Sequence, residues 1–251
     1  MNEEKLLQEE IILNLLEYIN KQSKDTIENI SKIINKERRK KYKENREKKL
    51  GDNSKAISED KFNILISNTK DQRLKLIFQI MYYMGLRVSE VVLIKKNDII
   101  NNRLTINNIK AKRIETRIIP LKLNELILKY IKNNNDKISK NKYLFTNIKN
   151  SQHISKDFVR KKFKEITLKY NINEVYYENE IIHPKTKKLV KRKLYLYSTH
   201  SLRHSFAKRF YEKSKCDIEK TRIAMRHKLI KDTQTYINGD IEEVNKLMLE
   251  L

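Results

Sequence analysis

Glycine, proline, cysteine and tryptophan are scarce in this sequence. Its 251 residues include three glycines, two prolines, one cysteine and no tryptophan. The single cysteine, Cys216, excludes a disulfide framework and a cysteine-based zinc site, and it indicates a reducing compartment. Three scattered glycines cannot form a glycine-rich phosphate loop. We therefore do not expect an ATP-driven mechanism of that type.

Long hydrophobic runs are also missing. No apolar stretch approaches the roughly 18 residues that a membrane span requires. The N-terminus, MNEEKLLQEE, is acidic and lacks the hydrophobic core of a signal peptide. These absences predict a cytoplasmic protein that has no membrane partner.

Positive charge is what the chain has in excess. Lysine and arginine number 56 against 32 acidic residues, which gives a net charge of +24. Such a surplus favours a polyanionic partner, and nucleic acid is the first candidate. A membrane surface or a ribosomal partner would also suit it. The plain alternative is a basic, solvated surface in a sequence rich in lysine, asparagine and isoleucine.

Turn-forming residues at 51–53 mark the expected domain boundary. Before it, apolar residues recur at helical spacing and lead into the strongly charged stretch 36–49. In that stretch Arg39 and Arg46 are candidate contacts to DNA phosphates, although a solvated helix face or linker is an equal alternative. We expect residues 1–53 to form a short, basic, helical segment. The main domain would then be residues 54–251, including a C-terminal helix at 240–251.

The main domain reads as mainly α with a small antiparallel β-sheet, an α+β fold. Alternating segments flank a turn within residues 99–120, and residues 175–197 have the pattern of a long hairpin. Helical periodicity occupies residues 71–84, 86–94, 123–132, 155–170 and most of the chain after 197. Gly85 is the expected stop of the first of these helices.

Residues 199–236 contain the candidate reaction centre. His200 and Arg203 form a His-x-x-Arg motif, His227 follows, and Tyr236 comes nine residues later. Breaking a phosphodiester without a metal needs a side-chain oxygen nucleophile, fixed cations for the non-bridging oxygens and a proton for the leaving 5′-oxygen. Arginine binds phosphate through two parallel hydrogen bonds, and histidine moves protons. The set predicts phosphodiester exchange without a metal or another cofactor.

Four segments resemble the sequence boxes of the tyrosine recombinases, the phage-integrase and Xer class. GLRVSE at 85–90 resembles the first-arginine box, and HSLRHSFA at 200–207 resembles the second. RHKLIKDTQTY at 226–236 resembles the closing His-to-Tyr segment, and KAKRIETRIIPL at 110–121 resembles the hairpin that presents a catalytic lysine. Each box alone is weakly specific, but four in order are specific. The resemblance covers residues 56–251 and implies the catalytic domain of that family, preceded by a short helical N-terminal segment.

The resemblance implies a role for each matching residue. Tyr236 would be the nucleophile that forms a 3′-phosphotyrosine, and Arg87 and Arg203 would clamp the scissile phosphate. His227 would hydrogen-bond the phosphate. Glu90 would orient Arg87, because residues three apart on a helix share a face. Taken singly, each has a structural alternative; Arg203, for example, could form a buried salt bridge.

The family resemblance also implies which residues transfer protons. His200 would assist proton transfer from the tyrosine, and Lys112 would protonate the leaving 5′-oxygen. Lys110 and Arg113 compete with Lys112 for that role within the same turn, and both are candidate DNA contacts.

Three features depart from the family's pattern. The N-terminal segment is shorter than the family's usual DNA-clamping domain. Arg226 stands where the family usually has glycine, and it adds a candidate phosphate donor. The hairpin at 175–197 is longer than the usual link and carries lysines that suit DNA, a neighbouring subunit or plain surface decoration.

The sequence therefore predicts a site-specific DNA recombinase or integrase, acting on double-stranded DNA as a homodimer or tetramer and associated with DNA in the cytoplasm. The apolar stripe at 240–251 would dock on a neighbouring subunit, with packing on its own core as the alternative. A type IB topoisomerase is a close rival, although His200 argues against it because that family usually carries lysine there. A non-catalytic DNA-binding protein of the same fold is a rival from another class.

Overall fold

The computed structural model describes residues 55–108, 113–135, 138, 142–147, 152–182, 189–234 and 236, together with scattered positions between 14 and 44. The chain forms two compact units, Met1–Lys49 and Leu50–Leu251. In the first unit, every described residue is helical and exposed. The expected helix at 240–251 lies outside the described residues, so the sequence prediction for it stands as made.

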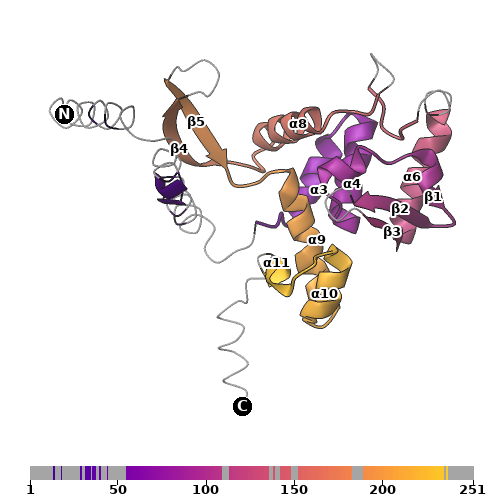
Figure 1. The fold of residues 1–251 in the computed structure, drawn as a ribbon. Helices are drawn as coiled ribbons and strands as arrows, with labels where there is room; N and C mark the ends of the chain where they lie inside the picture. Colours follow the sequence, from indigo (N-terminus) through magenta and orange to yellow (C-terminus); the bar gives the residue numbers. More distant parts are fainter. Residues whose placement is uncertain are drawn as a thin grey trace. The chain divides into compact units, whose positions relative to one another are not determined.

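Two helices form the centre of the second unit. Helix α4 (Gln72–Met84) buries residues on almost all of its faces, which is typical of a helix surrounded by protein. Its N-terminus is capped by the Asp71 carboxylate, which accepts a hydrogen bond from the Arg73 backbone N–H at 2.9 Å. Gly85 ends it in the left-handed conformation, as the sequence predicts. Helix α9 (Thr199–Lys213) packs beside α4 (Figure 1).

Shorter elements complete the helical body. They are α3 (Glu59–Asn68), α5 (Val88–Val91), the 3-10 helix η1 (Lys96–Asp98), α6 (Leu121–Asn133), α8 (Lys156–Lys169), α10 (Ile218–Met225) and α11 (Ile230–Gln234). Ser205 of α9 ties the start of the unit to this body, because its hydroxyl accepts from the Ile57 N–H at 2.8 Å and donates to the Ile57 carbonyl at 2.9 Å.

A small antiparallel sheet flanks the helices. It consists of β1 (Ile99–Ile100), β2 (Arg103–Asn108) and β3 (Arg113–Ile118), in that order. Thr105 pairs with Thr116 in the β2–β3 register. Leu104 and Ile106 alternate inward into the core, as strand periodicity requires. The two strands that the sequence predicts within residues 99–120 are present.

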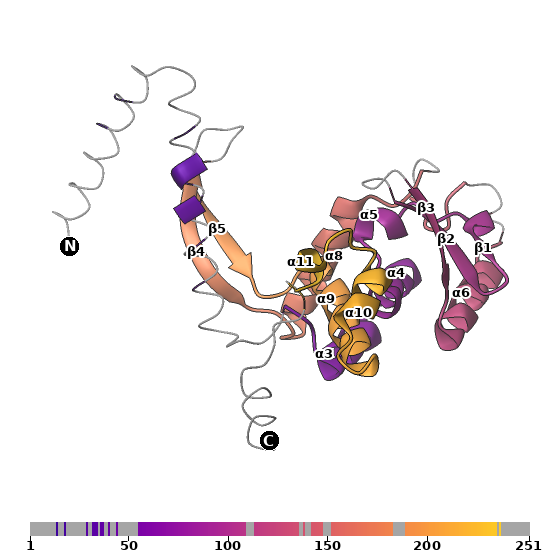
Figure 2. The ribbon, with the colours of Figure 1, turned by 60° about the horizontal axis from the view of Figure 1, so that its bottom comes forward.

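The second strand pair projects from the body as a hairpin (Figures 1 and 2). Strand β4 (Val175–Ile182) pairs antiparallel with β5 (Leu189–Tyr195). Buried Asn173 closes its base: its amide donates to the Tyr197 carbonyl at 2.8 Å and accepts from the Tyr197 N–H at 2.9 Å. This clamp sets the chain direction just before α9, which carries two candidate site residues.

The observed architecture confirms the predicted class, mainly α with small antiparallel β-structure. Within the described part of the chain, no helix combines the length and apolar character needed to cross a membrane.

Candidate active site

The first-arginine segment joins the end of α4 to α5. Arg87 is the N-cap residue of α5, and the Glu90 carboxylate folds back on it. Glu90 Oε2 accepts a hydrogen bond from the Arg87 backbone N–H at 2.7 Å, and Oε1 accepts one from Arg87 Nη1 at 3.2 Å. Glu90 is buried, whereas 26% of the Arg87 side chain is exposed. The Glu90 carboxylate therefore holds both the backbone and the guanidinium of Arg87, while part of that guanidinium side chain stays exposed.

Arg226 lies in the protein interior. The sequence had predicted it on the protein surface, as a donor to DNA phosphate. Its side chain is 1% exposed, and Nη2 donates to Glu90 Oε2 at 2.7 Å. Burial would raise the pKa of Glu90, but the charge and hydrogen bond of Arg226, together with Arg87, lower that pKa below its usual value. The guanidinium is engaged with a buried carboxylate, so the structure does not present it as a phosphate donor.

Arg203 is fully buried at the junction of α4, α9 and α10. Its Nη1 donates to the Gly85 carbonyl, and its Nη2 donates to the Met225 carbonyl at 2.5 Å. Burial, followed by the charge of Arg87, lowers the pKa of Arg203 to about 10. The side chain is therefore a cation at neutral pH, held in place by backbone carbonyls from two separate segments.

His227 follows the end of α10 and faces Arg203. Its Nε2 lies 3.1 Å from Arg203 Nη2, and its Nδ1 lies 3.0 Å from Thr233 Oγ1. Because a guanidinium can only donate, Nε2 accepts and the ring proton resides on Nδ1, which donates to Thr233. Burial, followed by the charges of Arg203 and Arg87, lowers the pKa of His227 to about 4. The imidazole is neutral near pH 7.

Tyr236 is placed among three histidines. Its hydroxyl lies 2.7 Å from His200 Nε2, which is within reach for direct proton transfer. The His204 ring stacks on the tyrosine with centroids 4.1 Å apart, and the His227 ring lies at 5.1 Å. The Tyr236 N–H donates to the Thr233 carbonyl at 2.9 Å, which anchors the tyrosine behind α11.

The structure thus brings six of the predicted residues into one cluster from three segments of the chain. They are Arg87, Glu90, His200, Arg203, His227 and Tyr236. In this cluster an imidazole nitrogen of His200 lies within hydrogen-bond distance of the tyrosine hydroxyl, and fixed cations lie beside the buried, neutral imidazole of His227. Such a group can carry out nucleophilic attack on a phosphodiester.

Other predicted residues are not tested by the structure. Arg39, Arg46, Lys110 and Lys112 lie outside the described residues, and Arg113 opens β3 without a described side chain. Among the residues that are described, no group of three or more histidine, cysteine or acidic side chains could hold a metal ion.

Sequence reasoning missed several partners in the cluster. Thr233 accepts the hydrogen bond from His227 Nδ1, and the Gly85 and Met225 carbonyls hold Arg203. His204, which follows Arg203 in the second box, packs directly on the tyrosine ring. A signal existed for Thr233, because it lies three residues before the tyrosine within the same box. No sequence signal identifies which backbone carbonyls will meet a buried arginine.

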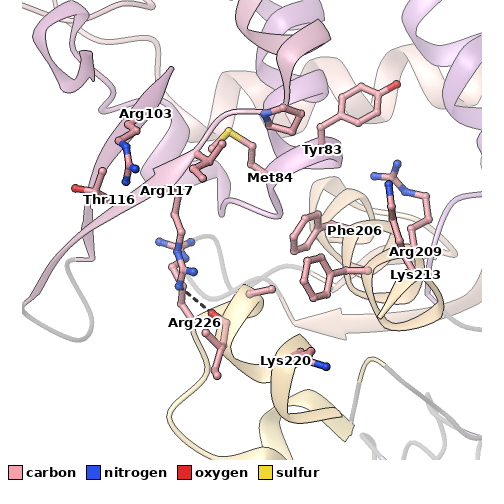
Figure 3. Close-up of a pocket in the computed structure, with 15 residues that line it drawn as sticks. Tyr83, Met84, Arg103, Thr116, Arg117, Phe206, Arg209, Lys213, Lys220 and Arg226 are labelled. Atoms are coloured by element: carbon pink, nitrogen blue, oxygen red, sulfur yellow. Dashed lines mark hydrogen bonds between the residues drawn. The ribbon is translucent and has the colours of Figure 1, made fainter. Parts of the chain in front are cut away.

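A cavity of about 800 Å³ adjoins the cluster at Arg226 (Figure 3). Apolar side chains such as Met84, Phe206 and Ile223 line it, and cations surround them. Arg117 of β3 donates to the Ile223 carbonyl at 2.8 Å, so the sheet and α10 are joined across this cavity. The cationic lining residues are Arg103, Arg117, Arg209, Lys213, Lys220 and Arg226.

Comparisons with known proteins support the fold. The model of the Phage integrase family matches residues 55–243. The chain is 30% identical over 174 residues to the tyrosine recombinase XerH of Campylobacter jejuni, a match that covers 68% of this chain and 43% of that protein.

Solved structures of recombinases share the fold. The XerA recombinase matches with a TM-score of 0.56 and 19% identity, over 78% of this chain and 64% of that one. XerH in a post-cleavage complex with a palindromic difH substrate matches with a TM-score of 0.58 and 17% identity, over 78% and 53%. A lambda integrase dimer bound to a COC′ core site matches with a TM-score of 0.52 and 15% identity, over 72% and 58%. These similarities confirm the predicted catalytic-domain fold, although the match spans only about half the length of these relatives.

Proposed function

Because this chain belongs to the phage integrase family, we propose that it is a site-specific DNA recombinase that cleaves and rejoins double-stranded DNA through Tyr236. One observation carries the proposal above the others. The Tyr236 hydroxyl lies 2.7 Å from a histidine nitrogen, beside a buried arginine that is held by backbone carbonyls. A tyrosine that served only in packing would not need a proton acceptor and fixed cations around it.

The proposed reaction is a phosphoryl exchange. Tyr236 Oη attacks the scissile phosphorus, its proton passes to His200 Nε2, and the bond from phosphorus to the 5′-oxygen breaks. The 5′-oxygen takes a proton from Lys112, the residue that the family resemblance implies. The new 3′-phosphotyrosine ester retains the energy of the broken bond, so the rejoining step needs no ATP. A second DNA end then attacks the ester and releases the tyrosine.

Charge in the transition state would be stabilised by Arg87 and Arg203. Arg203 needs little reorganisation, because protein carbonyls already fix its guanidinium. Arg87 is the partly exposed arginine and would close on the phosphate. A direct hydrogen bond from His227 to the phosphate requires Nδ1–H to exchange Thr233 for a phosphate oxygen, because Nε2 accepts from Arg203 and carries no proton. Until then His227 acts on the phosphate through Arg203.

The experiment that tests the proposal is covalent trapping on a nicked suicide DNA substrate. Wild type should form a protein–DNA adduct that resists denaturing electrophoresis, and Tyr236→Phe should form none. Tyr143→Phe, which removes a hydroxyl elsewhere in the domain, is the matched control and should behave as wild type. The proposal fails if wild type forms no adduct or if Tyr236→Phe still forms one. Relaxation of supercoiled plasmid that lacks a specific site would instead indicate a type IB topoisomerase, and DNA binding without an adduct would indicate a non-catalytic protein.

DNA contacts beyond the cluster belong to the same proposal. Residues 1–53 would act as a short, basic DNA-contacting segment through Arg39 and Arg46, and Lys110, together with Arg113 at the start of β3, would add further contacts. The net charge of +24 supports binding to a polyanion. The protein would then act in the cytoplasm, at the DNA.

Assembly on DNA as a dimer or tetramer is also proposed, with residues 240–251 docking on a neighbouring subunit. That segment, DIEEVNKLMLEL, combines an apolar stripe with four acidic residues. The cavity of Figure 3 has matching chemistry, because its apolar walls lie among five cations besides Arg226, whose guanidinium is paired with Glu90. Removing residues 240–251 should abolish higher-order complexes in a gel-shift assay on DNA while single-protomer binding persists. Unchanged complexes would contradict the docking.

A further inference from the structure

Arg226 occupies a backbone position that favours glycine. It is the C-cap of α10, with φ of 58° and ψ of 40°. Its N–H donates to the Ile223 carbonyl, and the next N–H, of His227, donates to the Arg222 carbonyl, both at 3.1 Å. This is the Schellman pattern of helix termination, in which a residue with a Cβ is strained. Other non-glycine residues such as Lys215 and Cys216 also have positive φ, so the contacts of the Arg226 side chain, and not the strain alone, indicate its role.

The side chain supplies a second cation to a buried carboxylate. Glu90 is 6% exposed and receives hydrogen bonds from the Arg87 backbone, Arg87 Nη1 and Arg226 Nη2. With Arg226 present, the three side chains carry one net positive charge. Without it, Arg87 and Glu90 would neutralise each other, and Arg87 would be held as the sole partner of a desolvated anion.

The same contact joins two segments that lie 136 residues apart in the chain. Arg226 contacts Glu90 in the first-arginine segment, and the adjacent His227 contacts Arg203 and Thr233. One short loop therefore sets the position of Arg87 through Glu90 and the position of Arg203 through His227.

We propose that Arg226 is a positioning residue: it neutralises Glu90 so that the charge of Arg87 remains available to the scissile phosphate. This inference rests on the proposed recombinase function. Arg226 itself contacts no DNA in this scheme, because its guanidinium is buried against Glu90.

The test is the rate of adduct formation in a single turnover on the suicide substrate. Two truncations are used: Arg226→Met removes the charge, and Arg226→Gly also relieves the backbone strain. Both should slow adduct formation by about tenfold or more, the scale of weakening one phosphate donor. Affinity for an uncleavable DNA duplex should change by less than about twofold, because the lost group meets no phosphate. Arg226→Lys keeps a cation opposite Glu90 and should restore most of the rate.

Charge neutralisation is separated from a merely structural role by combining each truncation with Glu90→Gln. When position 90 carries no charge, Arg226→Met should change the adduct rate by less than about twofold relative to Glu90→Gln alone. Lys208→Met, which removes one exposed positive charge from α9, is the matched control and should leave the rate unchanged.

Two outcomes would overturn the inference. The first is a wild-type rate in both truncated variants. The second is an equal loss of rate in the presence and absence of the Glu90 charge, which would show that Arg226 only supports the loop. Absence of any adduct in the wild type would instead overturn the proposed function, and the inference with it.

Discussion

Gly85 offers the sharpest test of how the site is built. It adopts φ of 64° and its carbonyl accepts a hydrogen bond from Arg203. A Cβ added there would lie 2.4 Å from Phe206 Cδ1 and 2.9 Å from Phe206 Cγ, far inside normal contact. Gly85→Ala therefore combines left-handed backbone strain with a ring collision.

The expected loss of folding stability in Gly85→Ala is the sum of these two costs. Left-handed backbone costs a residue with a Cβ about 1–2 kcal/mol. Overpacking a well-filled contact adds about 1–3 kcal/mol, depending on how far the Phe206 ring moves. The variant should lose about 2–5 kcal/mol of stability, which corresponds to a Tm lower by about 4–20 °C in a domain of this size. Adduct formation should slow as well, because the displaced carbonyl no longer holds Arg203.

Urea unfolding of a double-mutant cycle measures the two costs separately. The cycle consists of wild type, Gly85→Ala, Phe206→Ala and the double variant. The ring collision should vanish in the Phe206→Ala background and leave only the backbone cost of about 1–2 kcal/mol. A loss below about 0.5 kcal/mol for Gly85→Ala alone would refute the reasoning, since it would match an ordinary surface change.

Three further predictions concern pH, the hairpin base and salt. Because His227 has a folded-state pKa of about 4 and an ordinary unfolded value of 6.5, the unfolded chain takes up the proton first. Stability is therefore fully present above pH 6.5 and falls as the pH drops toward 4, by on the order of 3 kcal/mol; urea midpoints of wild type and His227→Gln check this, and parallel pH curves would contradict it. Asn173→Ala leaves the buried N–H and carbonyl of Tyr197 unpaired, so unfolding experiments should show a loss of about 2–4 kcal/mol, and a neutral result would argue against the clamp. DNA affinity should fall by about 10³-fold or more between 50 and 200 mM salt if six or more phosphates are contacted, and a flat response in a binding titration would argue against binding through phosphates.

Much of the fold follows from local patterns. The apolar run of α4 and its glycine stop, the two strands within residues 99–120 and the hairpin after residue 175 all appear where periodicity predicts them. Side-chain period and turn chemistry involve residues within a few positions of each other, so they can be read from the chain alone.

Short spacing along the chain also predicts part of the candidate site, but not all of it. His200 and Arg203 share one helix, and His227 and Tyr236 share one short segment, so their spacing along the chain already suggests a common site. The position of the Arg226 side chain could not be predicted from local spacing. A basic residue at that position reads as a DNA contact, but its side chain is buried on Glu90, 136 residues away.

Residue type and short spacing were enough to predict the class of fold, to locate the family boxes and to nominate the candidate reacting groups. The folded structure was needed to show which arginines are buried, which ring nitrogen of His227 carries the proton, and which carboxylate pairs with Arg226. Burial and partner choice depend on segments that meet from far apart in the chain, where the cost of leaving a buried charge unpaired selects the contact.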